Sequence, residues 1–108
     1  MPLYMTQFSY TPEAWAALAR NPEDRREAVG RLAESVGGHL VSMYYSFGKY
    51  DGFLIMEAPD EKAAAAAVVT SVSVGHIRMI KTTTLLTVED TLEALRKTGE
   101  MTFRGAGQ

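Results

Sequence analysis

No cysteine occurs among the 108 residues of this chain. A disulfide framework, a thiolate metal site and a cysteine nucleophile are therefore excluded. A long apolar run is also missing, because the longest weakly polar stretch, residues 63–69, is mostly alanine and far shorter than the roughly 20 residues that a membrane span needs. Residues 1–7 have neither the basic start nor the apolar middle of a secretory signal. We therefore expect a cytoplasmic protein with no membrane partner.

Concentrated positive charge is absent as well. Eleven Lys and Arg residues stand against thirteen Asp and Glu residues, and the basic residues occur singly or in pairs such as Arg25-Arg26 and Arg96-Lys97. Binding to a phosphate backbone usually needs a concentrated basic face, so we expect no nucleic-acid partner. The composition, 46% hydrophobic and 22% charged, is that of an ordinary globular domain, and the length suits one domain.

The pattern of apolar residues, turns and helix-capping residues predicts strands alternating with helices. Residues 47–52, a polar turn flanked by two apolar runs, indicate a β-hairpin in the middle of the chain. The predicted strands cover residues 3–10, 39–47, 53–58 and 77–86. The predicted helices begin at Thr11-Pro12, Asn21-Pro22, Asp60 and Thr87.

This order, β-α-β-β-α-β with an added C-terminal helix, predicts an α+β fold of the ferredoxin-like type, with a four-stranded antiparallel sheet. Residues 1–97 are expected to form the domain, and residues 98–108 a flexible tail. The first and third strands are apolar on both faces, which indicates burial on both faces. A second copy of the chain covering the open face of the sheet, in a homodimer or larger homo-oligomer, is therefore expected.

Four short motifs, in this order and spacing, resemble those of the GYD-domain family. They are Gly48-Lys49-Tyr50-Asp51, Glu57-Ala58-Pro59-Asp60, Gly75-His76-Ile77-Arg78 and Leu86-Thr87-Val88-Glu89. The likeness runs from about Leu3 to Leu95 and implies the dimeric α/β-barrel type of fold, in which two ferredoxin-like sheets pack face to face. It implies little about chemistry, since the wider group holds monooxygenases, isomerases, haem-handling proteins and apparent non-enzymes.

Three residues are candidates for catalysis. Glu57, at the end of a central strand, is a carboxylate that needs a partner or a raised pKa if it is buried. By strand parity Arg78 falls on the same side of the sheet, and an ion pair within the chain or a subunit contact is the alternative for this pair. His76 begins the last strand and could move protons.

Gln7 and Tyr45 interrupt apolar strands and are candidates for lining a small-molecule pocket, with hydrogen bonding inside the core as the alternative. Tyr50 and Asp51 are expected to shape the hairpin turn. Neither His39 nor His76 has a second ligand at the short spacing of most metal sites, so we predict no metal and no cofactor.

Together these residues predict a homo-oligomer that binds a small apolar or aromatic molecule. The alternative is a cofactor-independent enzyme, an isomerase, cyclase or monooxygenase acting on an aromatic or polyketide-like molecule. In that case Glu57 or His76 would move protons, and Arg78 or Tyr45 would stabilise developing negative charge.

Overall fold

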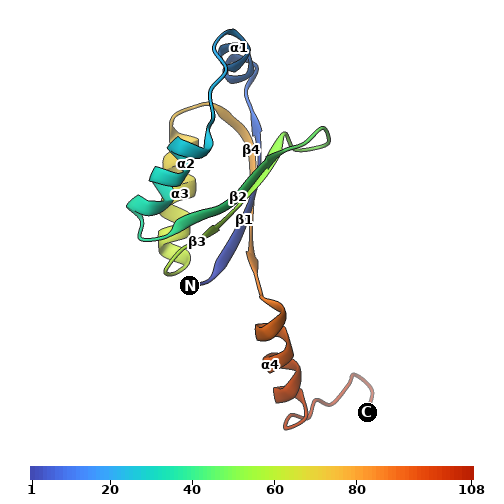
Figure 1. The fold of residues 1–108 in the computed structure, drawn as a ribbon. Helices are drawn as coiled ribbons and strands as arrows, with labels where there is room; N and C mark the ends of the chain where they lie inside the picture. Colours follow the sequence, from blue (N-terminus) through green and yellow to red (C-terminus); the bar gives the residue numbers. More distant parts are fainter.

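The computed structural model describes all residues 1–108 and contains one antiparallel sheet with strand order β2-β3-β1-β4 (Figure 1). This is the ferredoxin-like arrangement predicted from the sequence, within an α+β fold. The strands are β1 (Leu3–Tyr10), β2 (His39–Tyr45), β3 (Gly52–Glu57) and β4 (Ile77–Leu85). The helices are α1 (Pro12–Arg20), α2 (Arg26–Ser35), α3 (Glu61–Ser73) and α4 (Val88–Thr98).

Three of the four predicted helix starts are confirmed by their caps. The side chain of Thr11 accepts a hydrogen bond from the amide of Ala14, and Thr87 caps α4 in the same way. Asp60 accepts from the Ala63 amide at 2.9 Å. Each cap satisfies one of the backbone donors that a helix leaves free in its first turn, so these positions fix where the helices begin.

The predicted start of the second helix at Asn21-Pro22 is wrong, because α2 begins only at Arg26. The Asp24 carboxylate accepts from the Arg26 backbone amide at 3.0 Å and also binds the Arg26 guanidinium. This binding lowers the pKa of Asp24 to about 2. Asp24 therefore lies before the helix and anchors its first residue, and Arg25 enters α2 without a side-chain cap.

The core lies between the sheet and the two helices α2 and α3, which cover the same face of the sheet (Figure 1). Tyr4 of β1 is buried there against Met56 of β3. The rest of this cluster consists of small side chains, namely Ala33, Ala58, Ala64 and Ala67. The alanine-rich sequence of α3 thus lets the helix pack close to the strands.

The opposite face of the sheet carries no helix from this chain (Figure 1). Because side chains alternate along a strand, Leu3 and Met5 of β1 point there, next to Ile55 and Phe53 of β3. All four are only half-buried. The Phe53 ring also packs against Tyr44 of β2, with ring centroids 5.5 Å apart. The free face therefore carries an apolar patch, as predicted, beside polar side chains of the same strands.

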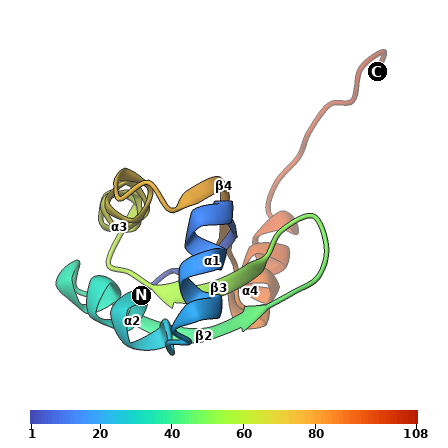
Figure 2. The same ribbon diagram turned by 90° about the horizontal axis from the view of Figure 1, so that it is seen from above.

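Helix α4 extends from the end of β4 away from the rest of the molecule (Figures 1 and 2). The chain measures 61 × 32 × 21 Å, and its radius of gyration is 17.8 Å. A compact domain of this length has a radius of gyration of about 13 Å. Every residue of α4 is exposed, including Val88, Leu92 and Leu95, which form one apolar stripe. None of the helices combines the length and the apolar character that crossing a membrane requires.

Candidate functional site

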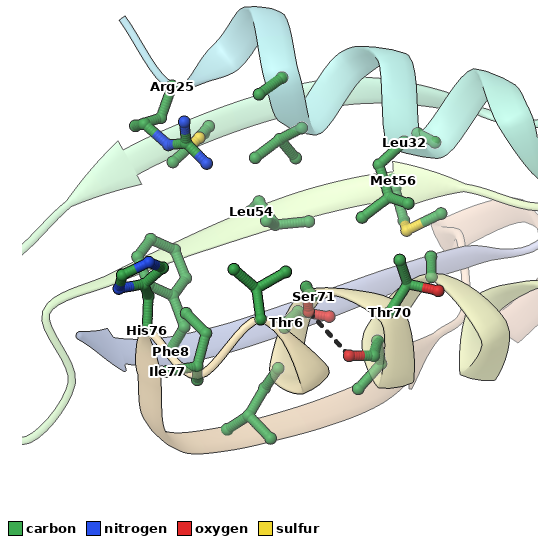
Figure 3. Close-up of a pocket in the computed structure, with 18 of the residues that line it drawn as sticks. Thr6, Phe8, Arg25, Leu32, Leu54, Met56, Thr70, Ser71, His76 and Ile77 are labelled. Atoms are coloured by element: carbon green, nitrogen blue, oxygen red, sulfur yellow. Dashed lines mark hydrogen bonds between the residues drawn. The ribbon is translucent and has the colours of Figure 1, made fainter. Parts of the chain in front are cut away.

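An apolar pocket of about 230 Å³ lies between the sheet and helices α2 and α3 (Figure 3). Of its 19 lining residues 14 are hydrophobic. Leu32 reaches into it from α2, and Leu54 and Met56 form part of its floor on β3. Val68 and Ile77, from α3 and β4, line it as well. The pocket therefore occupies the part of the helix–sheet layer that the small side chains of the core leave unfilled.

A cluster of aromatic side chains adjoins this pocket at the end of β1. Phe8 and Tyr10 are buried with ring centroids 5.2 Å apart, and Trp15 of α1 packs edge-on against Tyr10 at the same distance. The hydroxyl groups of Tyr10 and Tyr45 lie 3.3 Å apart. Burial, and then the hydrogen bond to Tyr45, raises the pKa of Tyr10 well above its usual value, so this phenol stays neutral.

Asp51, from the family-like motif, connects three separate parts of the chain. Its Oδ2 accepts a hydrogen bond from the Tyr10 backbone amide at 2.9 Å and another from Trp15 Nε1 at 3.0 Å. Its own amide donates to the Phe8 carbonyl. The sequence predicts a role for Asp51 within its own turn. Instead it fastens the β2–β3 hairpin to β1 and α1, which gives it a structural role over a longer range.

Glu57 lies at the end of β3, opposite His39 of β2 in the strand register. Its carboxylate is 3.4 Å from His39 Nε2, and about a third of the side chain is exposed. By strand alternation it belongs to the free face of the sheet, next to Leu3. Glu57 is therefore not among the residues that line the pocket.

Arg78 does not meet Glu57, because the two residues lie at opposite ends of the sheet, Glu57 beside Leu3 at the start of β1 and Arg78 beside Tyr10 at its end. The pairing of β1 with β4 shifts between Ser9 and Tyr10, so that Met79 pairs with Ser9 and Ile77 with Tyr10, and Arg78 is left as the extra residue. Its Nε donates to the Tyr10 carbonyl at 3.2 Å. Of the three residues proposed for catalysis only His76 lines the pocket. The structure does not bring them together.

The two residues proposed for ligand binding are also separated. Gln7 lies on the free face of the sheet, since it alternates with Thr6 and Phe8, which line the pocket. Tyr45 is half exposed and borders a second, more polar hollow formed with residues 23–26. Neither residue lines the apolar pocket, so a ligand role for them stays a prediction.

Sequence reasoning misses Arg25 as a pocket residue. In the sequence Arg25 and Arg26 form one of the basic pairs. In the structure Arg26 binds Asp24, whereas Arg25 lines the pocket. The sequence does not distinguish the two arginines, because it predicts a helix that begins near residue 22 and contains Arg25 in its first turn. No three His, Cys, Asp or Glu side chains converge in a way that could hold a metal ion.

The family profile of the GYD domain matches residues 4–95. The chain belongs to the GYD domain family. A Thermus thermophilus relative, named "Glutamine synthetase and cystathionine beta-lyase binding protein", is 28% identical over 78 residues, which is 72% of this chain and 82% of the relative. The Gly-x-Tyr-Asp motif of this GYD domain thus contains the aspartate that holds the hairpin, β1 and α1 together.

Two solved structures share the fold of this GYD domain. TTHA0845 from Thermus thermophilus superimposes with a TM-score of 0.53 at 13% identity and covers 82% of this chain and 96% of its own. MtbAldR superimposes with a TM-score of 0.58 at 14% identity over 99% of this chain and 59% of its own. At such low identity these likenesses concern the fold alone.

Proposed function

We propose that this GYD domain is a homo-oligomeric binding protein that holds a small, mostly apolar molecule between its sheet and helices α2 and α3. The pocket of about 230 Å³, with 14 apolar residues among 19, carries this proposal. For scale, an apolar cavity of about 150 Å³ in another protein takes up benzene. Room for a single ring with a short chain is therefore available, and ligand sites are typically apolar in this way.

Helix α4 and the free sheet face support the homo-oligomer. Isolated helices shorter than about 12–15 residues are marginal in water, and α4 has 11 residues with none buried. Its stripe of Val88, Leu92 and Leu95 would be covered if a second copy packed against it. The half-buried apolar side chains of the free face would gain burial in the same assembly. A cytoplasmic location belongs to the same proposal.

Binding of another protein is the second candidate function. The Thermus relative is named for binding glutamine synthetase and cystathionine beta-lyase, and it matches 72% of this chain. The exposed α4 offers an apolar surface that an enzyme partner could cover in place of a second copy. Under this alternative a purified glutamine synthetase would form a complex with the chain, and the Leu92 and Leu95 side chains would be needed for it.

The enzyme alternative has less support from the geometry. An isomerase, cyclase or monooxygenase using Glu57, His76 and Arg78 would need at least two of these groups at one substrate. His76 lines the pocket, whereas Glu57 pairs with His39 and Arg78 donates to the backbone of Tyr10. Catalysis by these residues therefore stays a prediction.

Native mass spectrometry of the freshly purified chain tests the proposed function. We expect assemblies at twice the 11.9 kDa chain mass or a higher multiple, some with the added mass of a small retained molecule. A monomer at micromolar concentration would contradict the homo-oligomer. An assembly that retains nothing and takes up no small apolar molecule on titration would contradict the ligand-binding part.

A further inference from the structure

The pocket is lined by a cationic side chain and by no anionic one. Among its lining residues are one arginine, Arg25, and one histidine, His76, and there is no aspartate, glutamate or lysine. Figure 3 shows both side chains at the same end of the pocket, while Met56 and Thr70 lie at the other end. A molecule with a negative group would thus meet two nitrogen donors at one end and apolar walls beyond them.

Arg25 has donors to spare. Its Nη1 donates to the Glu23 carboxylate at 2.8 Å, and a guanidinium carries five N–H donors in all. Both members of this ion pair are partly exposed, with side-chain exposures of 37% and 53%. Such surface pairs are weak, so Glu23 does not prevent Arg25 from binding a second anion. Arginine is also the side chain best suited to grip a carboxylate with two parallel hydrogen bonds.

His76 is held in place by the backbone and not by its ring. It follows Gly75, whose φ of +90° turns the chain out of α3, and its carbonyl accepts a hydrogen bond from the Thr11 amide at 2.9 Å. Its imidazole makes no hydrogen bond or ion pair with the rest of the chain. An N–H of the ring is therefore available to a ligand at the pocket end.

We propose that the pocket selects small organic anions, in which a ring or short chain fills the apolar part and one carboxylate lies at Arg25 and His76. This inference rests on the proposed ligand-binding function and adds the charge and the orientation of the ligand. The volume suits a ligand with about ten non-hydrogen atoms inside the pocket, judged from the cavity that accepts benzene.

The test compares two molecules of equal size, 3-phenylpropanoate and its neutral amide, 3-phenylpropanamide. Binding is followed by NMR from the methyl signals of Leu54, Ile77 and Ile80, with Val41 on β2 as a remote methyl. We expect the carboxylate to bind about tenfold more tightly than the amide, because hydrogen bonds to a charged acceptor are roughly twice as strong. Only the pocket methyls should shift.

Arg25→Met keeps an apolar stem of similar length and removes the charge. It should abolish the preference for the carboxylate and weaken binding of the amide only slightly, because the amide loses one hydrogen bond to a neutral acceptor. Unchanged signals of the remote methyl groups of Val41 report that the variant is folded. Arg31→Met is the matched control, because Arg31 lies on α2, which Arg25 directly precedes, is largely exposed and pairs only with Glu27. His76→Gln, which can still donate, should reduce the preference by about threefold or less.

Each outcome separates this inference from the function on which it rests. Equal binding of the two molecules in the wild-type chain would overturn the anion site and leave the apolar pocket in place. A preference for the carboxylate that survives Arg25→Met would overturn the assignment to Arg25. If neither molecule shifts the pocket methyls at about 10 mM or above, the proposed ligand-binding function fails together with the inference.

Discussion

Helices α3 and α4 have similar local signals but very different surroundings. Each is capped by a side-chain oxygen, Asp60 for α3 and Thr87 for α4, and α4 also has acidic residues in its first turn and basic ones in its last. Yet α3 buries Ala64 and Ala67 against the sheet, whereas α4 buries nothing. Local signals therefore specify that a helix forms, and tertiary packing decides whether it is stable. The body of the molecule, strands β1–β4 with α2 and α3, supplies that packing within one chain.

The largest effect is expected in the body, from Gly38→Ala. A Cβ at this position would lie 1.9 Å from the Glu57 carbonyl oxygen, so the backbone that joins α2 to β2 would have to move away from the end of β3. Overpacking of this kind costs typically 1–3 kcal/mol, and contact with backbone puts this case at about 3 kcal/mol or more. The free energy of unfolding is measured by urea denaturation at a fixed protein concentration.

Gly30→Ala is the matched control for this prediction. Gly30 lies inside α2, and nothing is within 4 Å of the position that its Cβ would take. Alanine should therefore stabilise the helix by about 1 kcal/mol. The two glycine-to-alanine changes should thus act in opposite directions, and an unchanged free energy of unfolding in Gly38→Ala would contradict the close contact between Gly38 and Glu57.

The second effect concerns the attachment of the hairpin to the body. Asp51→Ala removes the acceptor for the Tyr10 amide and for Trp15 Nε1. Hydrogen bonds to a charged group contribute about 1.5–3 kcal/mol when buried, and Trp15 is partly exposed, so we expect a loss of about 2–3 kcal/mol. Thermal unfolding followed by circular dichroism would show a midpoint lower by about 10 °C or more.

Two further variants locate the source of that loss. Asp51→Asn keeps an acceptor oxygen and should recover about half of the stability. Trp15→Phe removes only the indole donor, so combined with Asp51→Ala it should cost less than the sum of the two single changes. Full additivity in this double-mutant cycle would mean that the Asp51–Trp15 hydrogen bond contributes nothing.

The third change should leave the stability of the body nearly unchanged and weaken the association of copies of the chain. Leu92→Ser combined with Leu95→Ser removes most of the apolar stripe of α4, whose side chains are 45% and 58% exposed. Since these side chains pack on nothing in their own chain, the free energy of unfolding of the monomer should change by about 0.5 kcal/mol or less. The homo-oligomer should dissociate at concentrations where the wild-type chain is assembled, as measured by sedimentation equilibrium.

The control pair is Glu93→Ser with Lys97→Ser. These residues lie on the same helix, outside the apolar stripe, and their removal leaves the net charge unchanged. The assembly should persist in this variant. If it dissociates to the same extent, the apolar stripe is not the contact surface.

The smallest expected effect is a change with pH in the contribution of the Tyr10 hydroxyl to the stability of the fold. The folded-state pKa of Tyr10 is raised, so its contribution to stability is fully present below the unfolded pKa of about 10 and is lost as the pH rises through the folded value. Tyr10→Phe should cost about 1 kcal/mol at neutral pH, from the lost hydrogen bond to Tyr45. At about pH 11 the difference should shrink or change sign. Urea denaturation at both pH values would show it, and an unchanged difference would contradict it.

Most of the fold could be predicted because its signals are local. Thr11, Asp60 and Thr87 mark helix starts through hydrogen bonds only three residues long, and Gly37, with a φ of +87°, ends α2. The start of α2 could not be predicted in this way. Asn21-Pro22 offers the same local signal, but Asp24 binds the Arg26 amide and moves the start further along the chain.

The site could be predicted only in part, because its members are joined by contacts that spacing does not reveal. The sequence predicts Arg78 and Glu57 on the same side of the sheet, but Glu57 lies beside Leu3 and Arg78 beside Tyr10, at opposite ends of β1. His76 was identified as a candidate, and it does line the pocket. Arg25 was not, because the direction of its side chain depends on where α2 begins. The open space in the helix–sheet layer depends on three-dimensional packing and leaves no pattern in the sequence.

Strand β1 lies inside the sheet, yet both strands that pair with it are synthesised well after it. It pairs with β3, at residues 52–57, and with β4, where Leu3 lies opposite Leu85. At the roughly 5–20 residues per second of protein synthesis, β1 waits several seconds for its last partner. Contacts so distant in sequence also slow the folding of the released chain. Until β4 arrives, one edge of β1 has no partner strand and is open to pairing with other nascent chains, so completion of β4 closes a surface at which aggregation could begin.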